Sequence, residues 1–321
     1  MKKIVLPLFL IIAIIFIGDK VIFITLNYFY KNTTMGEDGG ELNNYLNNSK
    51  EIKMVLLGSS TTKLQVDPND FHIKTINLGH HSTSPLYQSG ILDIIIAKDK
   101  KPSIVLLSLS PTDFTIQPNV KVEQFQTEIL FLKYYYPESK LIKENMDKIA
   151  VTERLKYILW SYRFNGNIIK NFRYYFLSRK KGNLPLANFS YQQSSKGDSL
   201  KVIRLMEEDA QKGETDVRRQ NAAPVQHLIN IIETCKKNNI QLLCYYMPML
   251  LDRPHTLEAG TQVIDSLMTS YSIPYFKISK QNAPLLFQTS SYWVDLQHLN
   301  EKGGKIETAL LSKFVKDSLR N

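Results

Sequence analysis

The sequence predicts an α/β protein built on a parallel sheet of about five strands. Short apolar runs recur along the chain, and turn residues bound each of them. Segments with helical periodicity lie between most of these runs. Alternation of buried strands and helices is typical of a parallel sheet that helices cover. The predicted strands lie at about residues 52–57, 75–79, 104–109, 240–247 and 275–278.

The first predicted strand ends abruptly in Gly58-Ser59-Ser60. This pattern predicts a tight turn with a hydroxyl group at its tip, in which Gly58 takes the dihedral angles that the turn needs. The residues through about Gln65 are expected to open a helix whose free N–H groups point back at the turn. An α/β protein places a nucleophile at such a position. The alternative is a serine that only caps the helix.

A second polar stretch, Asp295-Leu296-Gln297-His298, follows the last predicted strand. An aspartate and a histidine three residues apart in one loop can both act on a single hydroxyl group. The histidine would be the base and the aspartate would orient it. A final helix is predicted from about Glu301 to Leu319, with Asn300 as its N-cap. Together with the serine turn, this loop favours nucleophilic chemistry.

At these two stretches the sequence resembles the SGNH or GDSL hydrolases. The family's Gly-Asp-Ser block corresponds to Gly58-Ser59-Ser60, and its Asp-x-x-His block to the stretch from Asp295 to His298. The Gly-Ser-Ser variant is similar to a membrane-anchored, cell-envelope branch. That branch includes the D-alanyl transfer protein of teichoic-acid modification and proteins that modify polysaccharide O-acetyl groups. The resemblance covers roughly residues 50 to 320 and implies a three-layer, flavodoxin-like fold.

The resemblance also implies the catalytic residues. Ser60 holds the third position of the first block and would be the nucleophile, with His298 as the base and Asp295 as its partner. The oxyanion hole would use the backbone N–H groups of Ser60 and Gly79, because a glycine at the end of the second strand carries the family's second block.

The third block departs from the family pattern. The family carries Gly-x-Asn-Asp, whose asparagine donates to the oxyanion, and this chain has Ser110-Pro111-Thr112-Asp113. Thr112 stands in the donor position, and its hydroxyl group would have to donate instead. Asp113 is retained.

The N-terminal segment decides the compartment. Lys2 and Lys3 precede an apolar run of about 15 residues, which Asp19-Lys20 interrupts before the run resumes to residue 26. A hydrocarbon core needs about 20 residues, so the continued run can span it. No small-x-small cleavage site follows. We expect an uncleaved signal anchor with the remaining chain outside the cytoplasm, and an interfacial aromatic belt at residues 28–30. The alternatives are a cleaved signal peptide and a buried helix.

Three parts of the chain are therefore expected. Residues 1–30 would be the membrane anchor, residues 31–50 a polar linker, and residues 51–321 a hydrolase-like domain. A helical insertion at about residues 120–222, rich in aromatic and basic residues, would cover the active site.

The composition excludes several classes of protein. The net charge is +10, but no dense basic run accompanies a nucleic-acid motif, so we expect no nucleic-acid partner. The excess favours anionic lipid or an acidic envelope polymer, or is only a solubilising surface. Cys235 and Cys244 have neither metal-site nor disulfide-framework spacing, so buried apolar cysteines or a single disulfide remain. No metal is implied, and no cofactor is implied because Rossmann and P-loop patterns are absent.

The resemblance implies a function. We expect a single-pass, cell-membrane serine esterase with its catalytic domain on the periplasmic or extracellular side, acting on acyl esters, most simply O-acetyl groups, of cell-envelope polysaccharide. One alternative is acyl transfer onto an envelope polymer by the same triad, with a membrane O-acyltransferase as partner. Another is a non-catalytic envelope protein that uses the fold for assembly or binding.

Overall fold

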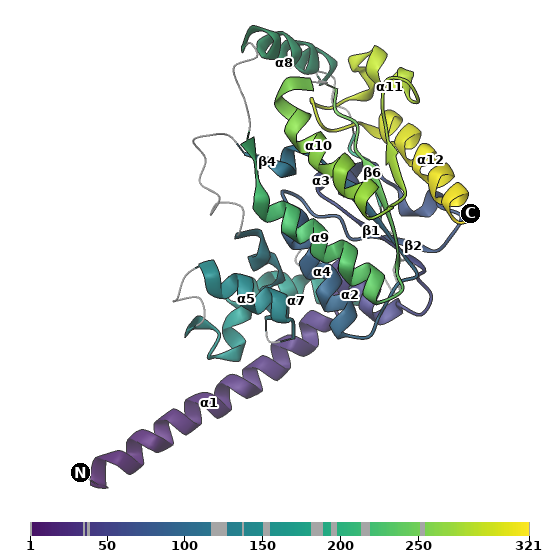
Figure 1. The fold of residues 1–321 in the computed structure, drawn as a ribbon. Coiled ribbons are helices and arrows are strands. Elements are labelled where there is room, and N and C mark those ends of the chain that lie inside the picture. Colours follow the sequence, from purple (N-terminus) through teal and green to yellow (C-terminus); the bar gives the residue numbers. More distant parts are fainter. Residues whose placement is uncertain are drawn as a thin grey trace.

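Five parallel strands form the central sheet of the protein (Figure 1). The computed structural model describes residues 2–34, 36, 39–116, 127–136, 138–149, 155–180, 189–193, 198–212, 219–250 and 254–320. The strands follow the order β2-β1-β3-β6-β7, which is the doubly wound, flavodoxin-like order. The predicted α/β fold class and parallel sheet are confirmed. The strands are β1 (Met54–Leu57), β2 (Thr75–Asn77), β3 (Ile104–Leu109), β6 (Gln241–Tyr246) and β7 (Tyr275–Lys277).

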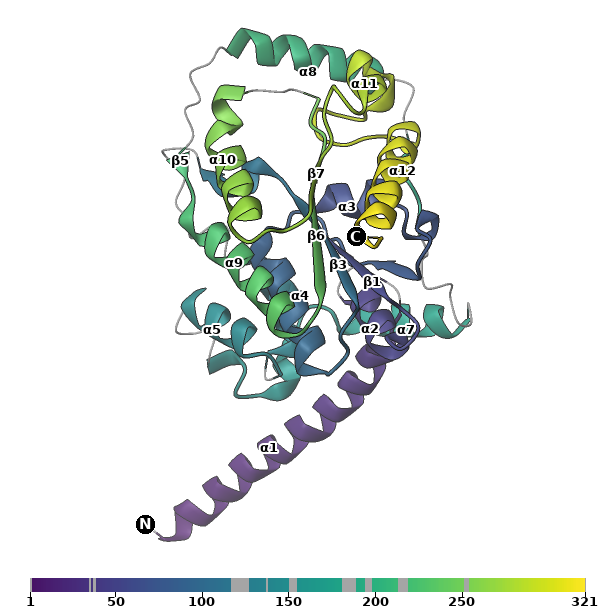
Figure 2. The ribbon, with the colours of Figure 1, turned by 45° about the vertical axis from the view of Figure 1, so that its right-hand side comes forward.

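Helices cover both faces of the sheet, because side chains alternate between the faces along each strand. Val55 and Leu57 of β1 pack into the core on the side of α4, α9 and α10. Met54 and Leu56 pack into a second core on the side of α11 and α12, and Figure 2 shows the two layers on either side of the strands. These helices are α4 (Pro85–Ala97), α9 (Ala222–Lys237), α10 (Pro254–Ser270), α11 (Pro284–Gln288) and α12 (Glu301–Ser318). Shorter helical segments are α3 (Ser60–Gln65), η1 (Pro68–Asp70), η2 (Pro111–Phe114) and η6 (Ser290–Tyr292).

Helix α1 (Lys2–Lys31) projects from the body of the molecule, with the N-terminus at its far end (Figure 1). It is long and apolar enough to cross a membrane. Its C-terminal part packs on the protein: the Tyr30 ring is buried and stacks on Tyr134 with 4.2 Å between centroids. Phe29 is half-buried and packs edge-on against Phe172, with 4.6 Å between centroids. The predicted aromatic belt is therefore wrong for Tyr30, because an aromatic side chain from a distant segment covers its ring.

Residues 40–48, expected in a polar linker, form helix α2 (Gly40–Asn48). Its Leu42 and Tyr45 side chains are buried in the core. The Asn43 amide also donates to the Tyr30 carbonyl oxygen at 2.7 Å. The linker prediction is wrong for this segment, because tertiary contacts use asparagines that look like loop residues in the sequence. Residues 35, 37 and 38 lie outside the described part of the chain.

The predicted insertion begins and ends at a small antiparallel pair, β4 (Thr115–Ile116) and β5 (Arg219–Gln220). Residues 117–126, 137, 150–154, 181–188, 194–197 and 213–218 lie outside the described residues. Within the described part, η4 and α5 pack on α4, and η5 and α7 pack on α1. The bounds of the insertion remain a prediction. Its elements are η4 (Thr127–Tyr135), α5 (Lys140–Ile149), η5 (Trp160–Phe164), α7 (Ile168–Lys180) and α8 (Asp198–Lys212).

The two cysteines are free, buried thiols, so the alternative of a disulfide is excluded in this structure. Cys235 lies in α9 and Cys244 in β6. Burial raises the pKa of the Cys235 thiol to about 12, which keeps the sulfur protonated and unreactive.

Candidate active site

Ser60 lies at the carboxyl end of β1 and opens helix α3. The turn between them has no room for a side chain at Gly58. A Cβ atom there would lie 2.0 Å from Thr62 Oγ1 and 2.7 Å from Ser108 Cβ. Gly58 lies outside the left-handed backbone region. Glycine is therefore required for close packing of the turn, and not for the unusual dihedral angles that we expected.

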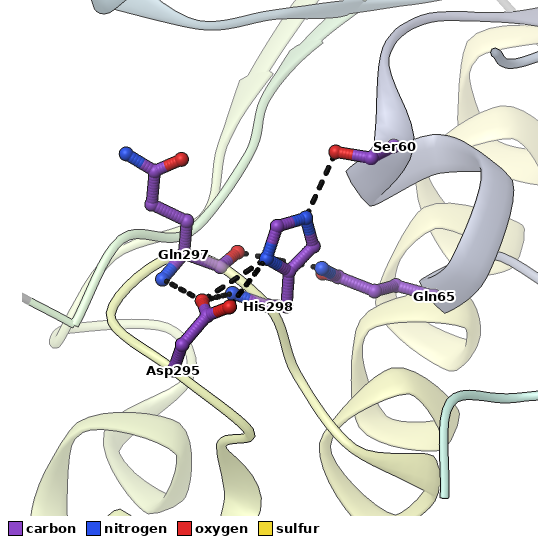
Figure 3. Close-up of polar contacts among 5 residues, drawn as sticks. All are labelled: Ser60, Gln65, Asp295, Gln297 and His298. Atoms are coloured by element: carbon purple, nitrogen blue, oxygen red, sulfur yellow. Dashed lines mark hydrogen bonds and ion pairs between the residues drawn. The ribbon is translucent and has the colours of Figure 1, made fainter. Parts of the chain in front are cut away.

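The structure brings Ser60, His298 and Asp295 together, as Figure 3 shows. Ser60 Oγ lies 2.8 Å from His298 Nε2. His298 Nδ1 lies 2.9 Å from Asp295 Oδ2 and 3.0 Å from Oδ1. An ionised carboxylate only accepts hydrogen bonds. Nδ1 therefore carries the ring proton, and Nε2 is left to accept from the serine hydroxyl group.

The loop that carries Asp295 and His298 closes on itself. Val294 N donates to the His298 carbonyl oxygen at 2.8 Å. Asp295 Oδ1 accepts from the backbone N–H groups of Gln297 and His298, both at 2.8 Å. Partial burial acts to raise the pKa of Asp295, but the hydrogen bonds from His298 and Gln297 outweigh it and lower the pKa below its usual value. The carboxylate is therefore ionised at neutral pH.

Helix α12 holds this loop against the helix that carries Ser60. Asn300 Oδ1 accepts from Lys302 N at 3.0 Å and from Gly303 N at 3.2 Å, which confirms Asn300 as the N-cap. A Cβ atom on Gly304 would lie only 2.8 Å from the Gln65 carbonyl oxygen. Because α12 approaches α3 this closely, Ser60 and His298 are held within hydrogen-bonding distance although 238 residues separate them.

The Gln65 side chain, at the end of α3, lies beside the loop that carries His298 (Figure 3). In one orientation its Nε2 donates to the Gln297 carbonyl oxygen at 3.3 Å. With the amide turned over, it donates to Glu307 Oε2 at 3.1 Å and accepts from Leu299 N at 3.2 Å. Glu307 is fully buried in α12, and burial raises its pKa to about 8. The amide thus bridges the loop that carries His298 and a buried carboxyl group.

The predicted oxyanion donors divide into three cases. Ser60 is the first residue of α3, so its N–H group has no acceptor within the helix. The Thr112 hydroxyl group lines the same cavity as Ser60 and His298 and lies 2.7 Å from Ser110 Oγ. Gly79 N, however, donates to Asn77 Oδ1 at 2.9 Å. The prediction for Gly79 is therefore wrong, because the Asn77 side chain already uses its N–H group.

The site opens into a cavity of about 600 Å³ whose wall is rich in hydroxyl groups. Helix α4 begins at Pro85 with Ser84 as its N-cap, and the residues just before it line the cavity. Ser82 has a φ of 54°, in the left-handed region, a conformation that clusters at functional sites. The sequence signal for this wall was the run of three hydroxyl residues after β2. Cavity hydroxyl groups come from Ser59, Thr61, Ser82, Thr83, Ser84, Ser110, Thr112 and Thr127.

Two carboxyl groups also line the cavity. Burial raises the pKa of Asp113 to about 8, and the nearby Glu128 contributes to the shift. Burial likewise raises the pKa of Glu128 to about 7, against the lowering effect of the Ser84 hydroxyl and N–H groups that it accepts from. Both groups are largely neutral below about pH 6, one unit below the lower of these pKa values, so the cavity then carries little negative charge near the serine.

The described part of the insertion covers the site only at one edge. Thr127, Glu128 and Phe131 of η4 reach the cavity, whereas η5 and α7 pack on α1. The expected cover over the active site is therefore wrong for η5 and α7. The His80 ring lies 4.7 Å from the Phe131 ring, centroid to centroid, and supports it.

Comparisons with known proteins give remote likenesses only. No family model matches the chain, and no curated protein matches it. A solved structure from Bacteroides fragilis, described as an acylhydrolase, is 12% identical over 86% of this chain and 95% of that chain, with a TM-score of 0.41. A lipase/acylhydrolase from Enterococcus faecalis is 11% identical over 83% and 97%, with a TM-score of 0.36.

Proposed function

We propose that the protein is a membrane-anchored serine esterase that hydrolyses small acyl esters, most simply O-acetyl esters, of a cell-envelope polysaccharide. The observation that carries this proposal is the continuous contact from Ser60 Oγ to His298 Nε2, at 2.8 Å, and from His298 Nδ1 to Asp295. A serine, a histidine and a carboxylate in this order are the parts of a nucleophile, its base and the group that orients the base.

The reaction follows from this arrangement. His298 Nε2 takes the Ser60 proton as Oγ attacks the ester carbonyl carbon. The Ser60 N–H group and the Thr112 hydroxyl group stabilise the oxyanion. His298 then gives its proton to the leaving alcohol, and the acyl group stays on Ser60. A water molecule, activated by His298 in the same way, attacks the acyl-enzyme and releases the acid and the free serine.

The cavity favours a polar alcohol. Nine of its fifteen lining residues carry a hydroxyl group, and Phe131 and Met247 are its large apolar side chains. Such a wall can hydrogen-bond a sugar. Location on the outer side of a membrane is supported by Lys2 and Lys3, which open helix α1 and precede its apolar run.

Acyl transfer is a second candidate, because a sugar can replace water as the acceptor on the same acyl-enzyme. The volume of the cavity, about 600 Å³, is large enough to hold a sugar acceptor beside Ser60. In that case a membrane O-acyltransferase would supply the acyl group.

Kinetics of the full chain in detergent test the proposal. The substrates are a nitrophenyl acetate ester and an O-acetylated polysaccharide. Ser60→Ala and His298→Ala are each expected to lower kcat by about 10³-fold or more, and the double variant by no more than the single ones. Asp295→Asn is expected to lower kcat less.

Ser59→Ala is the matched control. It is expected to retain turnover, because Ser59 Oγ hydrogen-bonds Thr61 Oγ1 whereas Ser60 Oγ contacts His298. Wild-type rates in Ser60→Ala would refute the proposal. An added sugar acceptor that captures the acetyl group in preference to water would favour transfer. A folded chain with no turnover on any ester would favour a binding or assembly protein.

A further inference from the structure

The two halves of helix α1 have different surroundings. From Val5 to Ile17 its apolar side chains are largely exposed and the helix stands clear of the body (Figure 1, Figure 2). From Asp19 onward one side of the helix packs on η5 and α7. The opposite side stays apolar and exposed, with Val21, Ile22 and Ile24. The apolar surface of the helix therefore continues past the point where the protein body begins.

The charged residues Asp19 and Lys20 lie at this point of the helix. The segment at η5 provides hydrogen bonds to Asp19 and an aromatic ring against Lys20. The Asp19 carboxylate accepts from Trp160 N at 2.8 Å, from Ser161 N at 2.9 Å and from Ser161 Oγ at 2.7 Å. The Lys20 amine lies 3.4 Å from the centre of the Trp160 ring. Charges within an apolar helix are tolerated in a membrane when other protein groups pair with them. Residues 160 and 161 provide that pairing.

The length of the helix places this contact at the level of the lipid. The run that ends at Gly18 is about 22 Å long at 1.5 Å per residue, which is shorter than a hydrocarbon core of about 30 Å. The run continued to Leu26 is about 35 Å long and can span with some tilt. If α1 spans the bilayer, residues 19–26 lie in the leaflet from which the helix emerges toward the protein domain. The segment that packs against these residues therefore lies in the outer part of that leaflet.

The surface of that segment is suited to lipid. Ile169 is 84% exposed and Trp160 is 42% exposed. Further exposed apolar side chains are Leu155, Ile158, Leu159, Ile168 and Phe176. Residues 155–180 also contain six basic residues and no acidic residue. A surface of apolar and basic side chains with an exposed tryptophan is typical of protein that lies in the interface of an anionic membrane.

We propose that residues 155–180 form a lipid-binding surface that enters the leaflet from which α1 emerges. The occupant is the anionic bilayer itself, because the surface packs against the stretch of α1 that would lie in the bilayer and carries only positive charge. The protein domain is then held against the membrane at two places and not tethered by α1 alone. This inference rests on the proposal that α1 spans a membrane.

Fluorescence of the full chain in vesicles of phosphatidylcholine and phosphatidylglycerol tests it. Ile169→Cys carries an environment-sensitive fluorophore, and Ile158→Cys provides a second, independent position. Both native cysteines are buried and stay unlabelled in the folded protein. At both positions, a spin label attached to the lipid is expected to quench the fluorophore, and aqueous iodide is not. An unchanged urea midpoint shows that each labelled variant is folded.

Two further positions make the result decisive. Leu200→Cys lies on α8, at the opposite end of the molecule (Figure 1), and is 74% exposed; iodide is expected to quench it and lipid is not. Ile12→Cys lies within α1, and lipid quenching of its fluorophore shows whether this helix is inserted in the bilayer.

Iodide quenching at residues 158 and 169, with lipid quenching at residue 12, would refute the proposed lipid-binding surface. The proposals of a membrane anchor and of an esterase would be unaffected. Absence of lipid quenching at residue 12 would overturn both the anchor and the surface. Neither result concerns Ser60, whose activity is measured separately.

Discussion

Glu307 Oε2 lies 3.1 Å from the side-chain amide of Gln65, whose other end accepts from the backbone N–H group of Leu299, the residue after His298. The carboxyl group is fully buried in α12, and Gln65 ends the helix that Ser60 begins. A buried carboxyl group that keeps its proton can hydrogen-bond without the cost of burying a charge. This contact connects the pH dependence of stability to the region of the proposed active site.

The raised pKa of Glu307 predicts that stability falls as the pH rises. The folded state holds this proton up to a pKa of about 8, whereas the ordinary glutamate value is 4.5. Stabilisation is therefore complete below about pH 4.5 and is lost as the pH rises towards 8. Each pKa unit corresponds to about 1.4 kcal/mol. In urea unfolding of the detergent-solubilised chain, Glu307→Gln is expected to remove part of the decline between about pH 5 and 8, and Asp113 and Glu128 account for the remainder.

The control for this experiment is Glu301→Gln, on the exposed side of the same helix. Its pKa is lowered by the Lys305 ammonium group, so its contribution changes only at acid pH. A slope in Glu307→Gln as steep as that of the wild type would contradict the role of Glu307.

Close packing of α12 on α3 predicts a large effect of one methyl group. Gly304→Ala would bring Cβ to 2.8 Å from the Gln65 backbone oxygen and from the Tyr191 ring. We expect a loss of about 1 to 3 kcal/mol in unfolding free energy, with a lower kcat because Ser60 and His298 move apart. Gly18→Ala is the matched control, since no atom lies within 4 Å of its Cβ position. Equal stability and turnover in both variants would show that the packing does not position the site.

Thr112 replaces the asparagine donor of the family that the sequence resembles, and its hydroxyl group lies in the cavity beside Ser110. Thr112→Val keeps the shape and removes the donor. If the hydroxyl group stabilises the oxyanion, kcat is expected to fall by about a hundred- to thousand-fold, with little change in KM. Ser110→Ala, which removes only the neighbouring hydroxyl group, is expected to cost less. A fall in kcat of less than about threefold in Thr112→Val would show that backbone N–H groups stabilise the oxyanion without this hydroxyl group.

Much of the fold could be predicted from the sequence, because apolar runs and helical periodicity report burial directly. All five predicted strands are present, and Asn300 caps the last helix as expected. Helix α2 was missed because its asparagines have low helix propensity. Its stability depends on distant partners, such as the Tyr135 hydroxyl group that donates to Asn43 at 2.6 Å.

The site could be predicted where two short stretches carried its chemistry, at Ser60 and at the loop from Asp295 to His298. The error at Gly79 has a tertiary cause. Its N–H group bonds Asn77, whose amide in turn donates to the Thr62 and Val66 carbonyl oxygens at 2.6 and 2.9 Å. No local pattern reports such a network. The buried Glu307 was likewise missed, because a charged residue within a helix is expected at the surface.

Covalent labelling with a fluorophosphonate tests the central claim most directly, because the reagent modifies an activated serine and leaves ordinary hydroxyl groups largely unmodified. The account predicts that mass spectrometry of the labelled full chain finds the phosphonyl group on Ser60. It also predicts that His298→Ala reduces the labelling by orders of magnitude, since the base no longer takes the serine proton. A folded wild-type chain that stays unlabelled, or that is labelled at Ser59 instead, would contradict it.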